Sequence, residues 1–352
     1  MDLDRLRESI DEIDNQILSL LKKRMALVRS VGEVKKKEGG KIYRPEREHA
    51  ILERLKSLDK GEVGGRVIET IFREIFSASR NLQRSEIVAF LGPEGSFTHL
   101  AARKVFGAMA KYAPIESLDS LFKAVESGLT DYAVVPIENE IYGILGETVD
   151  LLEKYNVKIV SEIAISIHLV FASRCEEMNQ IERIYSKDIA FQECKRFLQR
   201  YCPEDARFIP VASTSKGAWL ADREEKSAAI CSTEAATLYH LPILYRNIED
   251  HRNNTRFVVL SDFENRPTGK DKTSLLANFS KSRKDLSRFF RRLTNAGITL
   301  IRIDALPVKS ASPFSYKFYM ELEGYSRDAR IEPVIKEYGE KIQWLGSYPE
   351  SV

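Results

Sequence analysis

The first 35 residues, MDLDRLRESIDEIDNQILSLLKKRMALVRSVGEVK (1–35), decide the fold of the N-terminal region. Apolar residues recur there at alternating steps of three and four, which is typical of a helix face that packs against other helices. Arg24 is the charged member of this apolar row. Because a guanidinium keeps its proton, it must pair with an anion when it is buried. The stretch therefore predicts a long helix that contributes to a buried anion site. The apolar members of the row are Leu3, Leu6, Ile10, Ile13, Ile17, Leu20, Leu27, Val31 and Val34.

Two further helices are expected after a break at Gly39-Gly40. The second helix begins near Pro45, a residue favoured in the first turn, and Glu48 lies on its apolar face. The third helix carries Ser79 and Gln83 in line with its apolar residues. All three helices thus bear polar groups at positions where packing alone would favour hydrocarbon.

Helical spacing separates the basic residues of the first helix into two groups. At about 100° per residue, Arg24 and Lys35 point within roughly 20° of each other, whereas Arg7 points about 100° away. Arg24 and Lys35 can share one pocket, and Arg7 more easily serves another. A helix about 50 Å long also has more apolar surface than two shorter helices can cover. A dimer in which each long helix spans two pockets would satisfy both observations.

Residues 1–85 resemble the all-helical chorismate mutases of the shikimate pathway. The matching motifs surround Arg7, Arg24 and Lys35 and include Arg-Pro-Glu-Arg-Glu from Arg44 to Glu48. The resemblance implies the following roles: Arg7 of the partner subunit and Arg24 bind the two substrate carboxylates, Lys35 and Gln83 bind the ether oxygen, Glu48 binds the ring hydroxyl, and Arg44, Arg47 and Ser79 bind substrate.

The chemistry of a chorismate mutase suits these residue types. A pericyclic rearrangement needs no nucleophile, general acid or metal, because the protein only holds a folded dianion and stabilises negative charge on the breaking C–O bond. Cations in a dry pocket can do both. The alternative is a three-helix module in which Arg24 and Glu48 form a structural ion pair.

Composition limits the remaining possibilities. A chain of 352 residues predicts two or three domains, and 54 basic against 52 acidic residues favour neither nucleic acid nor an anionic membrane as a partner. We expect small-molecule substrates and further copies of the chain, in a dimer or tetramer. The charged start and the lack of a long apolar stretch predict a cytoplasmic protein. The cysteines and histidines are scattered, so we expect neither a metal nor a disulfide, and the chemistry above needs no organic cofactor.

From Ile87 the pattern changes to alternating strands and helices. A strand at 87–91 leads through the glycine-bearing turn 92–99 into a helix, an arrangement that can bind anions at free backbone amides. A second strand at 132–137 delivers Glu138 and Asn139 at its carboxyl end, where α/β sheets gather ligands. Later elements are expected as strands at 164–171, 208–211 and 258–260 and helices at 191–201 and 216–222.

Residues 86–263 resemble prephenate dehydratase through the motifs Gly-Pro-Glu-Gly-Ser-Phe-Thr-His (92–99), Val-Pro-Ile-Glu-Asn (135–139) and Asn-Thr-Arg-Phe (254–257). The resemblance implies an α/β fold like that of periplasmic binding proteins. It implies a catalytic Thr255, with Asn139 orienting the substrate. Further substrate contacts are implied for Ser96, Thr98, Glu138, Ser186 and Arg256.

In the implied reaction the ring hydroxyl departs while carbon dioxide is lost, and aromatisation supplies the driving force. Thr255 would hydrogen-bond or protonate the leaving hydroxyl, and Arg256 and the amides of the glycine turn would hold carboxylates. A structural alternative is that Thr255 only caps a turn while Arg256 pairs with a surface acid.

The chain departs from the usual dehydratase pattern in the loop from Ser186 to Cys194. Glu193 stands where family members carry glutamine, and Glu140 stands where they usually carry serine. A carboxylate beside a dianionic substrate repels it unless Lys187 or Lys195 compensates or the carboxylate is protonated. Two alternatives to a dehydratase therefore stay open for this domain: an enzyme that decarboxylates prephenate without aromatising it, and a sensor that does not catalyse.

A polar linker at 264–270 precedes a strand, helix, strand, strand, helix, strand pattern. Residues 272–352 resemble the ACT domain, an α+β ferredoxin-like sensor that pairs with its copy and binds phenylalanine in dehydratases. Lys284-Asp285-Leu286 replaces the usual Gly-Ala-Leu, and Asp304-Ala305-Leu306-Pro307 replaces Glu-Ser-Arg-Pro. A lysine should obstruct the close approach that glycine allows. Phenylalanine as an effector and a purely structural, dimerising role are both consistent with this pattern.

The expected fold class is thus multidomain: an all-α mutase domain (1–85) that forms an intertwined dimer, an α/β dehydratase domain (86–263) and an α+β ACT domain (272–352).

Overall fold

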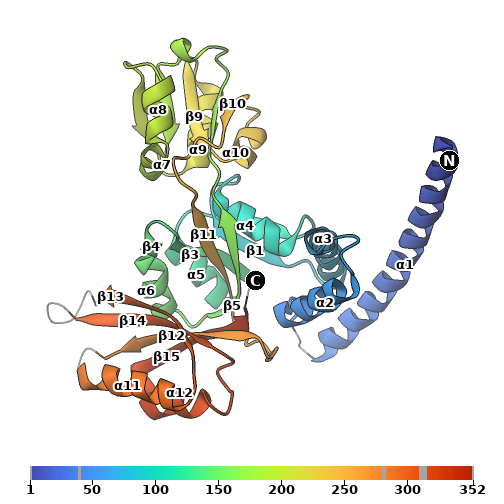
Figure 1. Cartoon of the computed structure of the whole chain (residues 1–352), viewed down its shortest axis with the longest axis vertical. Helices are drawn as coiled ribbons and strands as arrows, with labels where there is room; N and C mark the ends of the chain where they lie inside the picture. The colour runs from blue at the N-terminus through green and yellow to red at the C-terminus, as the bar shows by residue number, and fades with distance from the viewer. Residues whose placement is uncertain (1, 39–40, 280–282, 309–314, 351–352) are drawn as a thin grey trace. The chain divides into compact units, whose positions relative to one another are not determined.

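The computed structural model describes residues 2–38, 41–279, 283–308 and 315–350 (Figure 1). The contacts divide the chain into two units. The helical unit comprises Met1–Glu86 together with Phe106–Lys111, and the α/β unit comprises Ile87–Val105 and Tyr112–Val352. The glycine pair expected to end the first helix lies outside the described residues.

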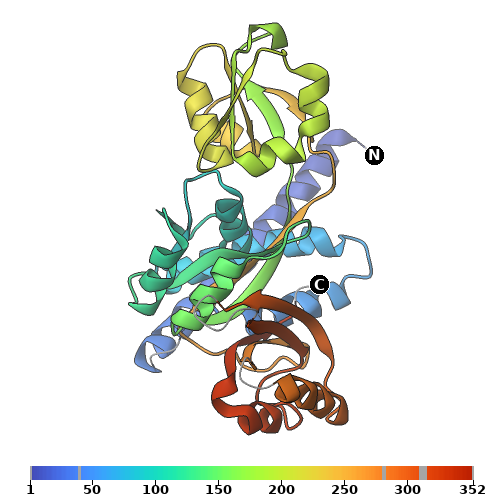
Figure 2. The same cartoon turned by 90° about the vertical axis from the view of Figure 1, so that its left-hand side faces the viewer.

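The helical unit contains α1 (Leu3–Glu38), α2 (Pro45–Leu58) and α3 (Gly65–Gln83). Pro45 occupies the first turn of α2, as the sequence predicts. Both α1 and α2 pack against α3, which buries Ile68 and Phe76. α1 is one uninterrupted helix (Figure 1), of which only parts are visible in the turned view (Figure 2). In the single chain the nine apolar residues of the α1 row are exposed, with fractions between 42% for Leu6 and 70% for Leu27.

The first lobe of the α/β unit is a mixed sheet with strand order β2-β1-β3-β11-β5 and with β4 beside β3. Ala133, Val135 and Ile137 of β3 and Val258 and Leu260 of β11 enter its core from alternate positions, because successive strand side chains face opposite sides of the sheet. The elements are β1 (Ile87–Leu91), α4 (Phe97–Phe106), β2 (Lys111–Ile115), α5 (Leu118–Glu126), β3 (Tyr132–Asn139), β4 (Gly143–Ile144), α6 (Gly146–Lys154), β5 (Lys158–Ser166) and β11 (Asn254–Ser261).

The second lobe is a sheet of order β10-β6-β9-β7-β8 with its own apolar cores. The chain crosses between the lobes twice, from β5 to β6 and from β10 to β11 (Figure 1). Its elements are β6 (Val170–Ser173), η1 (Met178–Gln180), β7 (Arg183–Ser186), α7 (Asp188–Glu193), α8 (Lys195–Tyr201), β8 (Arg207–Pro210), α9 (Thr214–Arg223), β9 (Ser227–Cys231), α10 (Thr233–Leu238) and β10 (Ile243–Arg246).

The crossing corrects one sequence prediction. The single strand expected at 164–171 is two strands, β5 and β6, which belong to different sheets. Between them the backbone pairs with the other crossing segment: Ile167 N donates to Asn253 O, and Leu169 O accepts from Ile248 N. The two crossing segments therefore supply hydrogen-bond partners for each other's backbone groups where they lie outside both sheets. The helix expected at 191–201 is likewise divided, into α7 and α8, at Cys194.

The C-terminal part forms an antiparallel sheet of order β13-β14-β12-β15 with α11 and α12. This strand order is the split β-α-β arrangement of ferredoxin-like folds. The elements are β12 (Asp271–Asn278), α11 (Arg283–Asn295), β13 (Leu300–Pro307), β14 (Tyr316–Glu323), α12 (Glu332–Tyr338), η2 (Gly339–Lys341) and β15 (Ile342–Pro349).

One side of this C-terminal sheet completes the apolar core of the first lobe. Leu276, Tyr319 and Leu345 belong to the same buried cluster as Val135 and Val258. Gly346 allows β15 to approach β5 closely, because a Cβ there would lie 2.2 Å from the carbonyl oxygen of Ile159. The C-terminal sheet is thus packed onto the strands that carry the second candidate site.

None of the helices in the described part of the chain combines the length and the apolar character that a membrane crossing requires.

Candidate active sites

Arg24 is half-buried between α1 and α3. Its Nη1 atom donates a hydrogen bond to Ser79 Oγ, and its guanidinium carbon lies 5.9 Å from the centre of the Phe76 ring. Burial lowers the pKa of Arg24, while the negative charge of Glu48 raises it. Among the described residues its hydrogen-bond partner is a neutral hydroxyl, so the charge is not neutralised by direct contact with a carboxylate. This is the environment expected of a cation that receives an anionic ligand.

Gln83 bonds to the same serine as Arg24, and the charge of Glu48 acts to raise the pKa of both Arg24 and Lys35. Gln83 Nε2 donates to Ser79 O at 3.2 Å, and its Oε1 atom is buried with no hydrogen-bond partner among the described residues. Gly32 makes room for this side chain, because a Cβ there would lie 2.9 Å from Gln83 Cγ. Lys35 Nζ donates to Ile42 O at 3.0 Å. Burial and the charge of Arg44 lower the pKa of Lys35. A buried acceptor without a partner is a feature that a ligand with a donor, or a rotation of the amide on ligand binding, would satisfy.

Glu48 forms an ion pair with Arg80, a residue for which the sequence predicts no role. The Arg80 side chain is 6% exposed and that of Glu48 is 21% exposed. Burial opposes the charge of Arg80, but Glu48 offsets it, so that the pKa of Arg80 is raised. The alternative of an Arg24–Glu48 structural pair is therefore not the arrangement found. The sequence signal that could have revealed this role is that Arg80 lies on the inward side of α3, three residues before Gln83.

The remaining basic residues lie apart from this cluster or at its edge. Arg7 is exposed and contacts Asp4 at 3.3 Å. It lies about five helical turns, or about 25 Å, from Arg24 along α1. Arg44 is half-buried and lies 3.8 Å from Glu46, and Arg47 is exposed. A single chain thus brings together Arg24, Lys35, Glu48, Ser79 and Gln83, but not Arg7.

The second candidate site centres on Thr255, which lies opposite Asn139 where β11 pairs with β3. Asn139 Nδ2 donates to Thr255 Oγ1 at 3.0 Å and to Asn253 Oδ1 at 2.9 Å. Asn139 Oδ1 in turn accepts from the amides of Ile141 and Tyr142. These bonds fix the orientation of the Asn139 amide. Thr255 therefore accepts a hydrogen bond, and within the described residues no acceptor takes its proton, which leaves it able to donate to a ligand.

Glu193 joins this network through Asn253. Asn253 is 3% exposed, and its Nδ2 atom donates to Glu193 Oε1 at 2.8 Å. Burial raises the pKa of Glu193, the hydrogen bond from Asn253 opposes this, and the nearby Glu249 adds to the rise. The carboxylate that departs from the family pattern is thus part of the site and is biased toward its neutral form. Asn253 directly precedes the Asn254-Thr255 pair, but the sequence predicts no role for it.

Glu138 and Arg256 lie on the opposite face of the sheet from Asn139 and Thr255. Arg256 Nε lies 2.9 Å from Glu138, and Nη1 lies 2.9 Å from Glu162 and 2.6 Å from Glu321 of the C-terminal sheet. Burial opposes the charge of Arg256, but the acids outweigh it and its pKa is raised. Both residues were expected at the substrate, and the structure does not bring them to Thr255, because neighbouring strand residues face opposite sides. In the structure both residues therefore belong to an ion-pair network on the face away from Thr255.

The serines of the dehydratase motifs and the amides of the glycine turn also form hydrogen bonds with other groups of the protein. Ser96 Oγ donates to Leu91 O and accepts from His99 N. Ser186 Oγ is fully buried and donates to Ile230 O. Thr98 is buried, with 6% of its surface exposed. The prediction that turn amides hold carboxylates is wrong for three of them: Gly92, Gly95 and Ser96 donate to Ile115 O, His99 Nδ1 and Pro93 O.

The turn is instead held by the second lobe. Ser232 Oγ donates to Gly95 O at 2.8 Å, and Ser215 Oγ donates to Glu94 O. Gly95 has a φ of +78°, and a Cβ on it would lie 3.0 Å from Ala235 Cα. The turn thus adopts a glycine-dependent conformation against the second lobe.

The molecule combines a helical unit in which Arg24 and Gln83 both bond to Ser79 with a two-lobed α/β unit in which asparagines orient a threonine. Residues 6–84 match the family described as Chorismate mutase type II, and residues 88–265 match Prephenate dehydratase. The chain belongs to the family of bifunctional chorismate mutase/prephenate dehydratases. Of its relatives, the bifunctional enzyme of Aquifex aeolicus (strain VF5) is 38% identical over 100% of this chain and 99% of its own length.

Two further similarities agree with this assignment. The bifunctional chorismate mutase/prephenate dehydratase of Neisseria gonorrhoeae is 35% identical and aligns with 98% of this chain and 96% of its own length. The solved prephenate dehydratase of Arthrobacter aurescens, in complex with L-Phe, superimposes with a TM-score of 0.68 at 27% identity, over 75% of this chain and 90% of that chain. The chain is therefore an isomerase and a lyase of phenylalanine biosynthesis, and neither alternative for its dehydratase domain is favoured.

Proposed function

We propose that Arg24, Lys35, Glu48, Ser79 and Gln83 of one subunit bind chorismate together with Arg7 of the partner subunit. The observation that carries this proposal is the buried Gln83 Oε1 atom without a partner, close to the half-buried charge of Arg24. The amide can rotate to present its donor to the ether oxygen, whose negative charge grows as the C–O bond breaks. The family resemblance implies that Arg44 and Arg47 also contact the substrate.

A dimer follows from the exposed row on α1. A contiguous apolar row is unusual on the surface of a protein and is typical of an interface. A second copy of α1 would cover it and would bring Arg7 of the partner subunit to a pocket that the first chain cannot reach with its own Arg7. The site is thus complete only when two chains associate.

Subunit mixing tests this arrangement. Arg7→Ala and Arg24→Ala proteins should each have little mutase activity, whereas a mixture that has exchanged subunits should regain activity, because some dimers then contain one intact pocket. The measurement is chorismate consumption before and after exchange, with exchange verified by mass-tagged subunits. Lack of recovery after verified exchange would rule out a pocket that takes these two arginines from different chains.

For the second reaction we propose that Thr255 donates its proton to the departing ring hydroxyl of prephenate. The C–C bond to the carboxylate breaks at the same time, its electron pair enters the ring as a new double bond, and the hydroxyl leaves as water with the proton. A solvent water then returns a proton to Thr255. The acceptor bond from Asn139 Nδ2 holds the Thr255 hydroxyl in place and strengthens it as a donor. Little acid strength is needed, because aromatisation drives the step.

Glu193 should make this second reaction sensitive to pH. Below its raised pKa Glu193 is neutral and tolerates the substrate dianion; as pH rises through that pKa the carboxylate ionises and repels the substrate. We expect kcat/KM for prephenate to fall over this range and Glu193→Gln to remove the fall. Because the folded state holds this proton more tightly, the associated stability is present at low pH and is lost as pH rises through the raised pKa. Glu193→Gln should therefore also raise the melting temperature at neutral pH.

The matched control for this prediction is Glu177→Gln, an exposed position in the same lobe, which should leave both the pH profile and the melting temperature unchanged. Identical pH profiles for Glu193→Gln and the unmodified protein would show that Glu193 does not face the substrate.

We propose that the C-terminal sheet and its helices are an ACT domain whose effector site has been lost. Asp285 lies in ion pairs with Arg288 and Lys341, at 3.1 and 2.7 Å. Leu306, which stands where dehydratases carry arginine, packs in the shared apolar core and supplies no cation for an amino-acid carboxylate. The phenylalanine bound in the Arthrobacter aurescens protein is therefore not expected to bind here.

Millimolar phenylalanine should accordingly leave the dehydratase rate and the melting temperature unchanged. A ligand that binds the folded state raises its stability by RT ln(1 + [L]/Kd), so a melting curve detects binding without reference to activity. A rise in melting temperature with inhibition, both abolished by substitutions at Lys284, would show that the altered domain still senses phenylalanine.

A further inference from the structure

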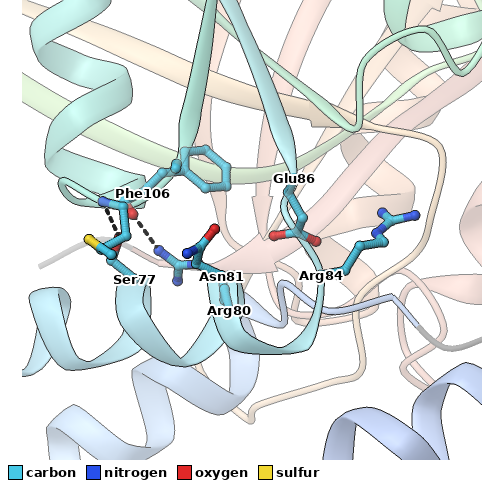
Figure 3. A pocket seen from close by; sticks show the side chains of 8 residues that line it. Ser77, Arg80, Asn81, Arg84, Glu86 and Phe106 are labelled. Carbon is cyan, nitrogen blue, oxygen red and sulfur yellow. Dashed lines mark hydrogen bonds between the residues drawn. The ribbon is translucent and has the colours of Figure 1, made fainter. Parts of the chain in front are cut away.

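Residues 106–110, which we call the 106–110 segment, lie in sequence within the dehydratase-family region but belong to the helical unit. The segment connects α4 to β2 and is fastened to α3 by three hydrogen bonds. Arg80 Nη2 donates to Phe106 O at 2.8 Å, Ala108 N donates to Glu74 Oε2 at 3.0 Å, and Met109 N donates to Ser77 Oγ at 3.0 Å. Figure 3 shows Ser77 and Arg80 directed toward the segment.

Close packing at Gly107 shows that the segment fits α3 specifically. Gly107 has a φ of +71°, and a Cβ on it would lie 2.6 Å from Ser77 Cβ. A side chain at this position would therefore push the segment away from α3. Ser77 is 2% exposed, which leaves it little room to move.

Arg80 joins the segment to the candidate mutase site. Its guanidinium carbon lies 5.3 Å from the centre of the Tyr43 ring and 5.5 Å from that of Phe106, and the two rings are themselves 4.9 Å apart. The same guanidinium forms the ion pair with Glu48. Two aromatic rings, a carbonyl and a carboxylate therefore fix its position.

We propose that the 106–110 segment is a working part of the mutase site, in which it holds Arg80 and Arg80 holds Glu48 in the position that binds the ring hydroxyl of chorismate. The inference rests on the proposed role of Glu48. Arg80 is a positioning residue, since it reaches the substrate only through Glu48. A substantial portion of mutase activity would thus depend on a stretch of chain that lies outside the region matched by the mutase family.

The charges around Glu48 explain why it needs such a partner. Glu48 is near enough to Arg24 and Lys35 for its negative charge to act on the pKa of both, in the direction that raises it. Without Arg80, the nearest compensation for this carboxylate would be the cations that the substrate carboxylates and ether oxygen require. By pairing with Glu48, Arg80 keeps those cations available for the substrate.

Gly107→Ala in the full-length protein tests the proposal without removing a charge. We expect mutase kcat/KM to fall at least about tenfold, the scale of one lost hydrogen bond to a charged group, while dehydration of supplied prephenate stays within about twofold. The matched control is Gly128→Ala. Gly128 has nearly the same φ, +72°, but a Cβ on it meets nothing within 4 Å, so it carries the backbone strain without the clash.

A substrate analogue separates positioning from general damage. If Gly107→Ala acts through Glu48, the defect should be large with chorismate and nearly absent with an analogue that lacks the ring hydroxyl, because Glu48 then has nothing to bind. Arg80→Met should show the same dependence on the hydroxyl, and Arg80→Lys should recover part of the rate on chorismate.

Mutase activity near that of the unmodified protein in Gly107→Ala, or an equal loss with chorismate and with the analogue, would overturn the proposal. The proposed pocket is tested separately by Arg24→Ala. If Arg24→Ala abolishes mutase activity and Gly107→Ala does not, the pocket stands and the role of the segment fails. If both variants retain full activity, the pocket assignment itself is wrong.

Discussion

Arg24→Ala should lower mutase kcat/KM by at least about two orders of magnitude, as expected when a charge contact worth roughly 3 kcal/mol in the transition state is lost. Arg24 is half-buried and bonds to the Ser79 hydroxyl, and the Gln83 amide bonds to the carbonyl of the same serine. Alanine removes the cation that we place at a substrate carboxylate and that no neighbouring side chain can replace in the same position. The measurement is the initial rate of chorismate loss, followed by ultraviolet absorbance.

The same protein should dehydrate supplied prephenate at the normal rate, because Thr255 and its asparagines belong to the α/β unit. Arg29→Ala is the matched control, since Arg29 is an exposed arginine on the same helix, about 140° around the helix axis from Arg24. Normal mutase activity in a folded Arg24→Ala protein would refute the pocket assignment, and an equal loss in Arg29→Ala would point to damage to α1 as a whole.

Periodicity predicts the helical unit well. The row that begins at Leu3 gives α1, and Pro45 marks the start of α2. Ser79 meets Arg24, and Gln83 bonds back to Ser79 one turn earlier, as four-residue spacing on α3 allows. The spacing within each helix is local, so that the sequence alone fixes which residues share a face.

The dehydratase motifs predict the second site less accurately if all residues of one motif are expected to face the same ligand. A strand alternates its side chains, so Thr255 and Arg256 point to opposite faces of the sheet, and the same holds for Asn139 and Glu138. This period of two is itself a property of the sequence, and it separates the site residues from the ion-pair network. Glu321, the partner of Arg256 in the C-terminal sheet, cannot be found in this way, because that contact joins residues 65 positions apart.

The role of Arg80 could not be predicted from the sequence for a different reason. The Phe106 carbonyl that fixes it lies 26 residues away, across the boundary between the two family matches. A division of the sequence at residue 85 therefore cuts through the helical unit, which includes Phe106–Lys111. A fragment of residues 1–85 should accordingly be compared with one that reaches residue 111, because the shorter one leaves Arg80 without its carbonyl partner.

Thr255→Val should abolish phenylpyruvate formation while prephenate accumulates from chorismate at the normal mutase rate. Valine keeps the shape of threonine and removes the hydroxyl, so the departing ring hydroxyl loses its proton donor. The Asn139 amide loses an acceptor at the same position, but it still donates to Asn253 Oδ1. Chromatography of chorismate, prephenate and phenylpyruvate over time measures both reactions in one sample.

Thr255→Ser restores the hydroxyl without the methyl group and should retain part of the dehydratase rate, because the Asn139 bond can still orient the donor. Thr237→Val, at an exposed position on α10, is the matched control and should leave both rates unchanged. A folded Thr255→Val protein that still forms phenylpyruvate at the normal rate would exclude Thr255 as the donor. Loss of activity in the serine variant as well would show that the position of the hydroxyl, and not only its presence, decides the rate, since serine lacks the methyl group that restricts its rotation.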